Sequence, residues 1–200
     1  MRTIRTAALL PIALVIVAGV RPAATGGNVT GVVNLPSART FPTVVFIERV
    51  TGGKFAPPTA HAVIDQMGKA FAPHVLPVLA GTTVDFLNGD DFEHSVFSPD
   101  GEKYDLGKWG KGQKRSYTFK QAGVYTQLCN IHPEMIGYVI ALETPYFALA
   151  DKQGAFQIRD VPAGQLMLKV WNERLRPAQL QKSFSVSVAE GQSAKVDVAF

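Results

Sequence analysis

The sequence predicts an all-β protein built from β-sandwiches. Short segments rich in β-branched and aromatic residues recur along the chain, and turns containing Gly or Pro separate them. The 18 glycines and 13 prolines in 200 residues suit an architecture with many turns. No long helical periodicity and no internal repeat follows the first 24 residues.

The first 24 residues have the pattern of a secretory signal. Arg2 and Arg5 precede an apolar stretch over residues 6–20, and small residues follow over 23–27. The stretch is shorter than the roughly 20 residues of a membrane-spanning helix. We expect cleavage near Ala24, a periplasmic or otherwise secreted protein, and no stable membrane insertion afterwards. The alternative is an uncleaved N-terminal anchor, since residues 24–26 fit a cleavage site only loosely.

The formal charge of +4 does not indicate a nucleic-acid partner. Removing three arginines with the signal, from 20 basic residues in all, leaves 17 against 16 acidic residues, a net charge of +1. No basic surface of the kind that neutralises phosphates is expected from this balance, so we expect no binding to nucleic acid.

The strands expected after the signal have alternating or continuous apolar patterns. A Gly/Pro-rich linker at 52–60 and a Gly-rich basic segment at 103–114 interrupt them. In chain order, strands are expected at 29–33, 43–50, 62–67, 75–79, 82–87, 94–97, 116–119, 124–128, 137–143, 147–150, 155–158, 165–171, 184–188 and 194–198.

The single cysteine, Cys129, has no partner for an internal disulfide. It is followed at spacings of three by His132 and Met135. Thiolate, imidazole and thioether are soft or borderline ligands, which suit copper better than calcium or magnesium. His94, at the end of an acidic loop 35 residues upstream, is the candidate for a second histidine ligand. Two histidines and a cysteine with a weak axial methionine form a blue-copper electron-transfer site.

Residues 60–143 resemble the cupredoxin family. The resemblance rests on Gly123-Val124-Tyr125 ahead of Cys129-x-x-His132-x-x-Met135, and on the runs 71–73, 78–84 and 88–90 ahead of His94. The two-residue spacings match the short loop of the amicyanin-like branch. The resemblance implies a Greek-key β-sandwich with one copper ion held by His94, Cys129, His132 and Met135. One position departs from many family members, which have Asn after the first histidine where this chain has Ser95. The resemblance implies that this position can hydrogen-bond the cysteine sulfur, which Ser95 can do through its hydroxyl or backbone N–H.

The flanks resemble a second, smaller β-sandwich of the carboxypeptidase regulatory-like, transthyretin-like type. The resemblance rests on residues 31–33, 44–47, 151–156 and 161–170. We expect 28–58 and 145–200 to form one discontinuous sandwich with the cupredoxin domain inserted between its halves. The alternative is an N-terminal extension that packs on the cupredoxin domain itself.

The expected function is transport of single electrons between redox proteins, by a carrier and not by an enzyme. The resemblance implies a partner that docks near His132, and we expect a monomer. One alternative is copper handling without a redox circuit, and another is a docking module with a structural copper site. A catalytic dyad of Cys129 and His132 leaves Met135 and His94 without a role.

We expect no metal-binding role for the other histidines or for the basic residues around Trp109. We expect a surface or hydrogen-bonding role for His61 and His74. The basic residues around Trp109 are either a docking patch for an acidic partner or, as we favour, a solvated loop; they are Lys108, Lys111, Lys114 and Arg115.

Overall fold

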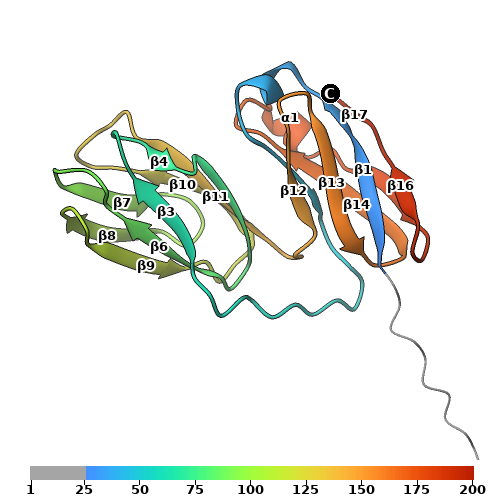
Figure 1. Cartoon of the computed structure of the whole chain (residues 1–200), viewed down its shortest axis with the longest axis horizontal. Coiled ribbons are helices and arrows are strands. Elements are labelled where there is room, and N and C mark those ends of the chain that lie inside the picture. The colour runs from blue at the N-terminus through green and yellow to red at the C-terminus, as the bar shows by residue number, and fades with distance from the viewer. Residues whose placement is uncertain (1–25) are drawn as a thin grey trace, which may run out of the picture.

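A computed structural model describes residues 26–200, and the expected signal at 1–24 lies outside the described residues. The described chain forms two β-sandwiches that lie side by side along the long axis of the molecule (Figure 1). We call them the central sandwich, built from strands within residues 62–142, and the flank sandwich, built from strands within residues 27–47 and 147–199. The predicted all-β class is confirmed.

The central sandwich consists of two sheets, with strand orders β5-β11-β10-β7-β8 and β4-β3-β6-β9. Two pairings are parallel, β3 with β6 and β5 with β11, and the others are antiparallel. The strands are β3 (Ala62–Gln66), β4 (Phe71–Ala72), β5 (Val75–Leu79), β6 (Thr83–Leu87), β7 (His94–Ser98), β8 (Tyr104–Trp109), β9 (Lys114–Thr118), β10 (Gly123–Leu128) and β11 (Ile136–Leu142).

The core between these sheets is built from inward-facing residues, which alternate with outward-facing residues along the strands. Ile64, Phe86, Val96 and Val139 are fully buried in it. Cys129 and Met135 belong to the same cluster of buried residues, so the expected metal loop closes over one end of the core instead of standing away from it.

The flank sandwich combines strands from both ends of the chain. Its sheets have the orders β13-β1-β16, with β17 also on β1, and β12-β2-β14-β15. The N-terminal strands β1 and β2 therefore lie between strands that come after the central sandwich. The strands are β1 (Gly27–Asn34), β2 (Thr43–Ile47), β12 (Phe147–Ala150), β13 (Ala155–Val161), β14 (Gly164–Trp171), β15 (Phe184–Val188), β16 (Ser193–Lys195) and β17 (Val198–Ala199).

The two sandwiches pack through an apolar cluster of their own. Val75, Ile140 and Leu142 from the central sandwich meet Val44 and Trp171 from the flank sandwich, and all five are buried. Each large apolar side chain buried in this way contributes about 1.5–3 kcal/mol. This contact explains why β11 and β2 are apolar on both faces, because one face of each strand lines its own core and the other lines the junction.

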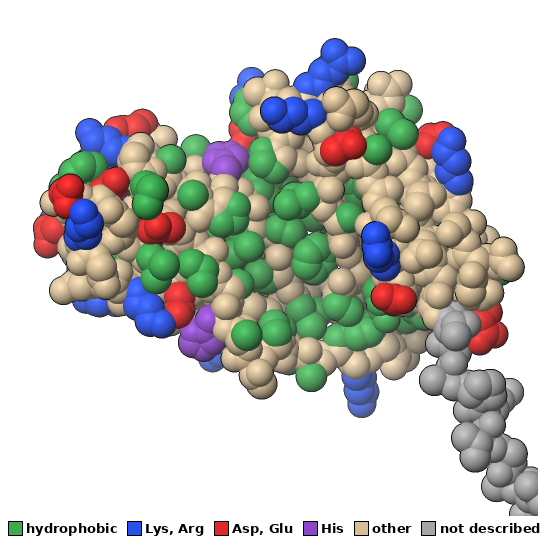
Figure 2. Space-filling model, in the orientation of Figure 1, with side chains coloured by type: hydrophobic (Ala, Val, Ile, Leu, Met, Phe, Trp, Pro, Cys, Tyr) green, Lys and Arg blue, Asp and Glu red, His purple; other side chains and the backbone are tan. Residues whose placement is uncertain are grey.

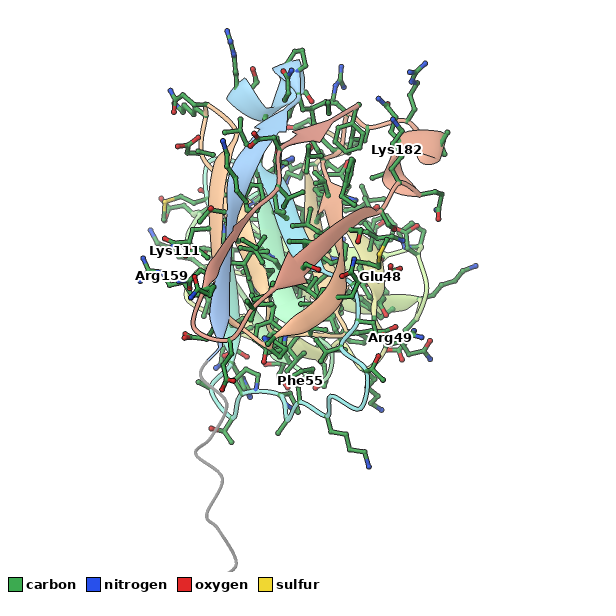
Figure 3. All side chains as sticks on the ribbon, turned by 90° about the vertical axis from the view of Figure 1, so that its right-hand side faces the viewer. Glu48, Arg49, Phe55, Lys111, Arg159 and Lys182 are labelled. Carbon is green, nitrogen blue, oxygen red and sulfur yellow. The ribbon has the colours of Figure 1, made fainter. Side chains whose placement is uncertain are left out.

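Both connections between the sandwiches pass the same end of the junction (Figure 1). Phe55 on the first connection packs edge-on against Tyr146 on the second, with ring centroids 5.5 Å apart. Figure 3 places Phe55 at the end of the flank sandwich opposite Lys182. Hydrophobic side chains gather over the junction on one face of the molecule (Figure 2). A hollow between the two sandwiches is lined by Pro58, Pro77 and Phe147, among others.

The element boundaries differ from the sequence expectations at a few places. The segment 103–114, treated as a Gly-rich loop, contains β8, which pairs with β7. The expected strand at 194–198 is split into β16 and β17. Two short helical turns, η1 (Pro36–Arg39) and α1 (Pro177–Leu180), were not anticipated. Among residues 26–200, no helix is long and apolar enough to cross a membrane.

Candidate metal centre

The expected ligands come from two places in the central sandwich that lie at the same end. His94 is the first residue of β7, and Cys129 directly follows β10. His132 and Met135 lie in the loop between β10 and β11, where the Met135 N–H donates a 3.0 Å hydrogen bond to the His132 carbonyl. Since β7 pairs with β10, the start of one strand and the end of the other meet, as the antiparallel arrangement requires.

Three donor atoms converge on one point. The Nδ1 atoms of His94 and His132 are 3.2 Å apart, and the Cys129 Sγ lies 4.0 Å from the His94 Nδ1. Ligands bound to one ion at about 2.0–2.3 Å can be at most about 4.5 Å apart. The three atoms therefore fit a single metal ion. His94 is fully buried, Cys129 is buried and His132 is half-buried, so the site opens toward solvent on the His132 side.

The surroundings of Cys129 favour the thiolate form that binds metal. Burial by itself raises the pKa of the thiol, but the backbone N–H groups of Ser95, His132 and Ile131, together with the His94 side chain, lower it to about 6. A thiolate present at neutral pH is the nucleophilic and metal-binding form of cysteine. The hydrogen bonds to the sulfur therefore favour a negatively charged Cys129 side chain, which attracts a metal cation.

Met135 is 1% exposed and packs in the same core cluster as Cys129. It lies three residues after His132, in the loop between β10 and β11. A buried thioether is a suitable weak ligand for copper. Without bound metal, the same side chain packs as an apolar core residue. Position and burial are thus consistent with the axial role expected from the sequence.

A mixed β-sandwich with a cysteine, two histidines and a buried methionine at one end has the features of one family. The central sandwich is cupredoxin-like. The flank sandwich is not part of this resemblance, and its likeness to carboxypeptidase regulatory-like domains remains a prediction.

Comparison with known proteins gave matches among solved structures alone. No protein-family model and no curated protein matches the chain. A purple cupredoxin from Nitrosopumilus maritimus matches at 25% identity and a TM-score of 0.38, over 40% of this chain and 98% of that one. Amicyanin from Paracoccus versutus matches at 24% identity and a TM-score of 0.39, over 48% and 96%. A copper-containing nitrite reductase from Thermus scotoductus matches at 29% identity and a TM-score of 0.41, over 57% of this chain but 28% of the reductase.

Asp90 holds the outer nitrogen of His94, a contact that the sequence analysis did not identify. The His94 Nε2 lies 2.9 Å from the Asp90 Oδ2, a contact that favours the tautomer in which the N–H at Nε2 donates to the carboxylate and the Nδ1 lone pair faces the site. Asp90 also accepts hydrogen bonds from the N–H groups of Gly68 and Lys69. Those bonds and the His94 contact lower the pKa of Asp90 to about 2.

Ser95 connects the two ligand segments. Its N–H and hydroxyl lie 3.5 and 3.7 Å from the Cys129 Sγ, and its Oγ accepts a 2.8 Å hydrogen bond from the Asn130 N–H. The serine therefore contacts the sulfur through both its backbone N–H and its hydroxyl.

The Phe92 ring packs against both histidine rings. Its ring centroid lies 5.1 Å from that of His94 and 5.3 Å from that of His132, both edge-on. Phe92 is 42% exposed. Ile136, which directly follows Met135 at the start of β11, is 40% exposed. Among the apolar residues next to the ligands in sequence, Val96 and Ile131 pack in the core, whereas Phe97 and Leu128 are half-buried outside that cluster.

The basic residues around Trp109 are mostly engaged locally. Lys111 pairs with Asp91, and Lys114 pairs with Asp85. Arg115 lies over the Trp109 ring at 5.7 Å. These contacts favour the solvated-loop interpretation over a free docking patch.

The two remaining histidines both hydrogen-bond carboxylates. The His61 Nδ1 lies 2.8 Å from the Asp85 Oδ1, and the His74 Nε2 lies 2.5 Å from the Glu173 Oε2. Neither belongs to the metal-ligand group found among the described residues, which contains His94, Cys129 and His132.

Proposed function

We propose that the chain binds one copper ion through His94, Cys129, His132 and Met135 and carries single electrons between redox partners in the periplasm or another compartment outside the cytoplasm. The observation that carries this proposal is the convergence of the Cys129 sulfur with two imidazole Nδ1 atoms in a largely buried site. Bound copper supplies a one-electron couple, and the protein acts as a carrier, not as an enzyme.

The chain's own residues serve this role by holding the donors in place and limiting water. Asp90 fixes the ring of His94, and Ser95 donates to the Cys129 sulfur. A donor set fixed before metal binding need not rearrange when the metal changes its charge, which favours rapid electron exchange. The core side chains around Met135 keep that side of the site dry.

A redox partner would approach at His132. His132 is half-buried, whereas His94 is fully buried. The shortest route from the metal site to solvent therefore leads through the His132 ring. Phe92 provides exposed apolar surface beside it. Such a small contact suits a transient complex, because redox encounters typically bury less than about 1,200 Å².

We also propose that the flank sandwich, with the boundaries 28–58 and 145–200, is one discontinuous domain and that 60–143 is the domain inserted in it. The support is the placement of β1 and β2 between strands that follow the central sandwich.

The test of the electron-carrier proposal compares electron exchange with copper exchange. The copper-loaded protein should show a reversible one-electron couple in voltammetry and retain its metal through many cycles in the presence of a competing chelator. Rapid loss of copper to the chelator, with no reversible couple, would contradict the carrier role and favour copper handling.

A further inference from the structure

We propose that the flank sandwich positions the metal loop, with Trp171 and Glu173 acting through Tyr138 and His74 to fix the start of β11 and with it Met135. This inference rests on the proposed copper site and assigns a role to the flank sandwich that the ligand set alone does not require.

The first contact is between aromatic rings on the two sandwiches. Tyr138 on β11 packs against Trp171 on β14, with ring centroids 4.9 Å apart at an interplanar angle of 58°. Trp171 is 6% exposed and belongs to the buried cluster at the junction. Such a close-packed contact resists displacement of either strand.

The second contact passes through His74, which precedes β5. Its carbonyl accepts a 2.8 Å hydrogen bond from the Tyr138 N–H, and its ring packs edge-on against the Tyr138 ring at 5.5 Å. The His74 Nε2 then lies 2.5 Å from the Glu173 carboxylate on the flank sandwich. Tyr138 is therefore held from its backbone and from its side chain by groups that are linked to the flank sandwich.

Glu173 stands on a well-fixed loop. Its neighbour Asn172 is fully buried and donates from Nδ2 to the Phe41 carbonyl and to the Thr43 Oγ1, at 3.1 and 2.9 Å. The Asn172 Oδ1 accepts from the Arg174 N–H at 3.0 Å. The loop that carries Glu173 is thereby tied to the strand β2 of the same sandwich.

The opposite face of β11 is equally confined. A side chain at Gly137 would place its Cβ 2.9 Å from the Phe71 Cβ, so the strand lies directly against Phe71 at this point. The start of β11 is thus held between the central core and the flank sandwich. Met135 lies three residues before Tyr138, about 10 Å along an extended chain. Because this connection is short, a displacement of Tyr138 is expected to displace Met135 as well.

The same junction offers a matched control at the other end of β11. Glu143 follows the strand and forms a bidentate ion pair with Arg49, at 2.8 and 2.9 Å. The Arg49 side chain is 74% exposed and the Glu143 side chain 44%, and an exposed ion pair contributes little to stability. Its removal alters the junction without touching the end of β11 that carries Met135.

The experiment uses the full mature chain with 13C-labelled methionine methyl groups, in the variants Trp171→Leu, Glu173→Ala and Glu143→Ala. The sequence has four methionines, of which Met67 and Met167 serve as internal references. In the metal-free protein, the Met135 methyl resonance should move in the first two variants and stay in place in Glu143→Ala. Glu173→Gln, which keeps a hydrogen-bond acceptor, should restore most of the original shift.

The copper-loaded proteins supply a second readout. Trp171→Leu and Glu173→Ala should change the intensity ratio of the thiolate-to-copper bands and the rhombicity of the copper EPR signal, with a loss of copper affinity of roughly tenfold or less. An unmoved Met135 resonance and unchanged spectra in both folded variants would overturn the positioning role. If the parent protein shows no blue copper spectrum, the proposed function fails, while the metal-free methionine resonances still decide the positioning role.

Discussion

The Ser95 hydroxyl and backbone N–H both face the Cys129 sulfur, and the same hydroxyl oxygen accepts from the Asn130 N–H. One small side chain therefore solvates the thiolate and ties the β7 end of the site to the loop after β10. Hydrogen bonds to a metal-bound thiolate withdraw electron density and favour the reduced metal, so this contact bears on the reduction potential.

Ser95→Ala should lower the reduction potential of the copper protein. A hydrogen bond is worth about 0.5–1.5 kcal/mol, which for a one-electron couple corresponds to roughly 20–60 mV. Voltammetry of the two proteins measures the difference. Ser98→Ala is the matched control, because Ser98 is buried in the same strand and its hydroxyl accepts from the Asp100 N–H instead. Equal potentials for Ser95→Ala and the parent protein would show that the hydroxyl does not act on the sulfur.

The metal-free protein should ionise Cys129 near pH 6, well below the usual value of about 8.5 for a free thiol. The ultraviolet absorbance of the thiolate as a function of pH measures this. Because the folded-state pKa is depressed, the associated stability is fully present above the unfolded pKa and is lost as the pH falls through about 6. A midpoint at the ordinary thiol value would mean that the surrounding N–H groups do not stabilise the thiolate.

Asp90→Asn should weaken copper binding by roughly 10–100-fold, the usual cost of losing the partner that orients a histidine ligand. The carboxylate accepts from the His94 Nε2–H, and an amide that can present its own N–H holds the tautomer less firmly. Competition with a copper chelator measures the affinity. Asp91→Asn should leave it unchanged, because Asp91 is exposed and pairs with Lys111 alone. Similar losses in both variants would point to loop charge, and not to ring orientation, as the cause.

Asp85 should support the fold in acid. Burial raises its pKa, but hydrogen bonds from Lys114, Ser116 and His61 lower it to about 2 overall. Since the folded-state pKa is depressed, this stability is present above the unfolded value of about 3.9 and disappears as the pH falls toward 2.

Asp85→Asn should therefore lower the melting temperature at pH 5 and bring the parent and variant closer together near pH 2. Thermal unfolding followed by circular dichroism checks both points, with Asp91→Asn as the exposed control. A difference in melting temperature that is the same at both pH values would rule out the ionised carboxylate as its source.

The fold class and the expected ligands could be read from the sequence because their signals are local. Short continuous apolar runs next to turn residues identify strands such as β5 and β12, whose bounds agree with those expected. Cys129, His132 and Met135 are chemically distinctive at a fixed spacing, and the structure places His94 beside the first two.

Other features depend on contacts between distant segments and gave no local signal. Asp90 looked like a loop acid, since its role depends on the turn at Gly68 and on the orientation of the His94 ring. The strand β8 was missed because Gly107, with φ at +71°, interrupts a polar, basic segment without clear alternation. The segment 137–143 was expected to be an apolar strand, but nothing in the sequence indicated that Trp171 would pack against Tyr138 on it.

The central claim is tested most directly by the visible absorption and EPR spectra of the mature protein after addition of one equivalent of Cu(II), alongside Cys129→Ala. The account predicts an intense blue band and a narrow copper hyperfine splitting in the parent protein, and loss of both in the variant. A colourless parent protein, or one with an ordinary tetragonal Cu(II) spectrum that survives Cys129→Ala, would contradict a blue-copper site at His94, Cys129 and His132.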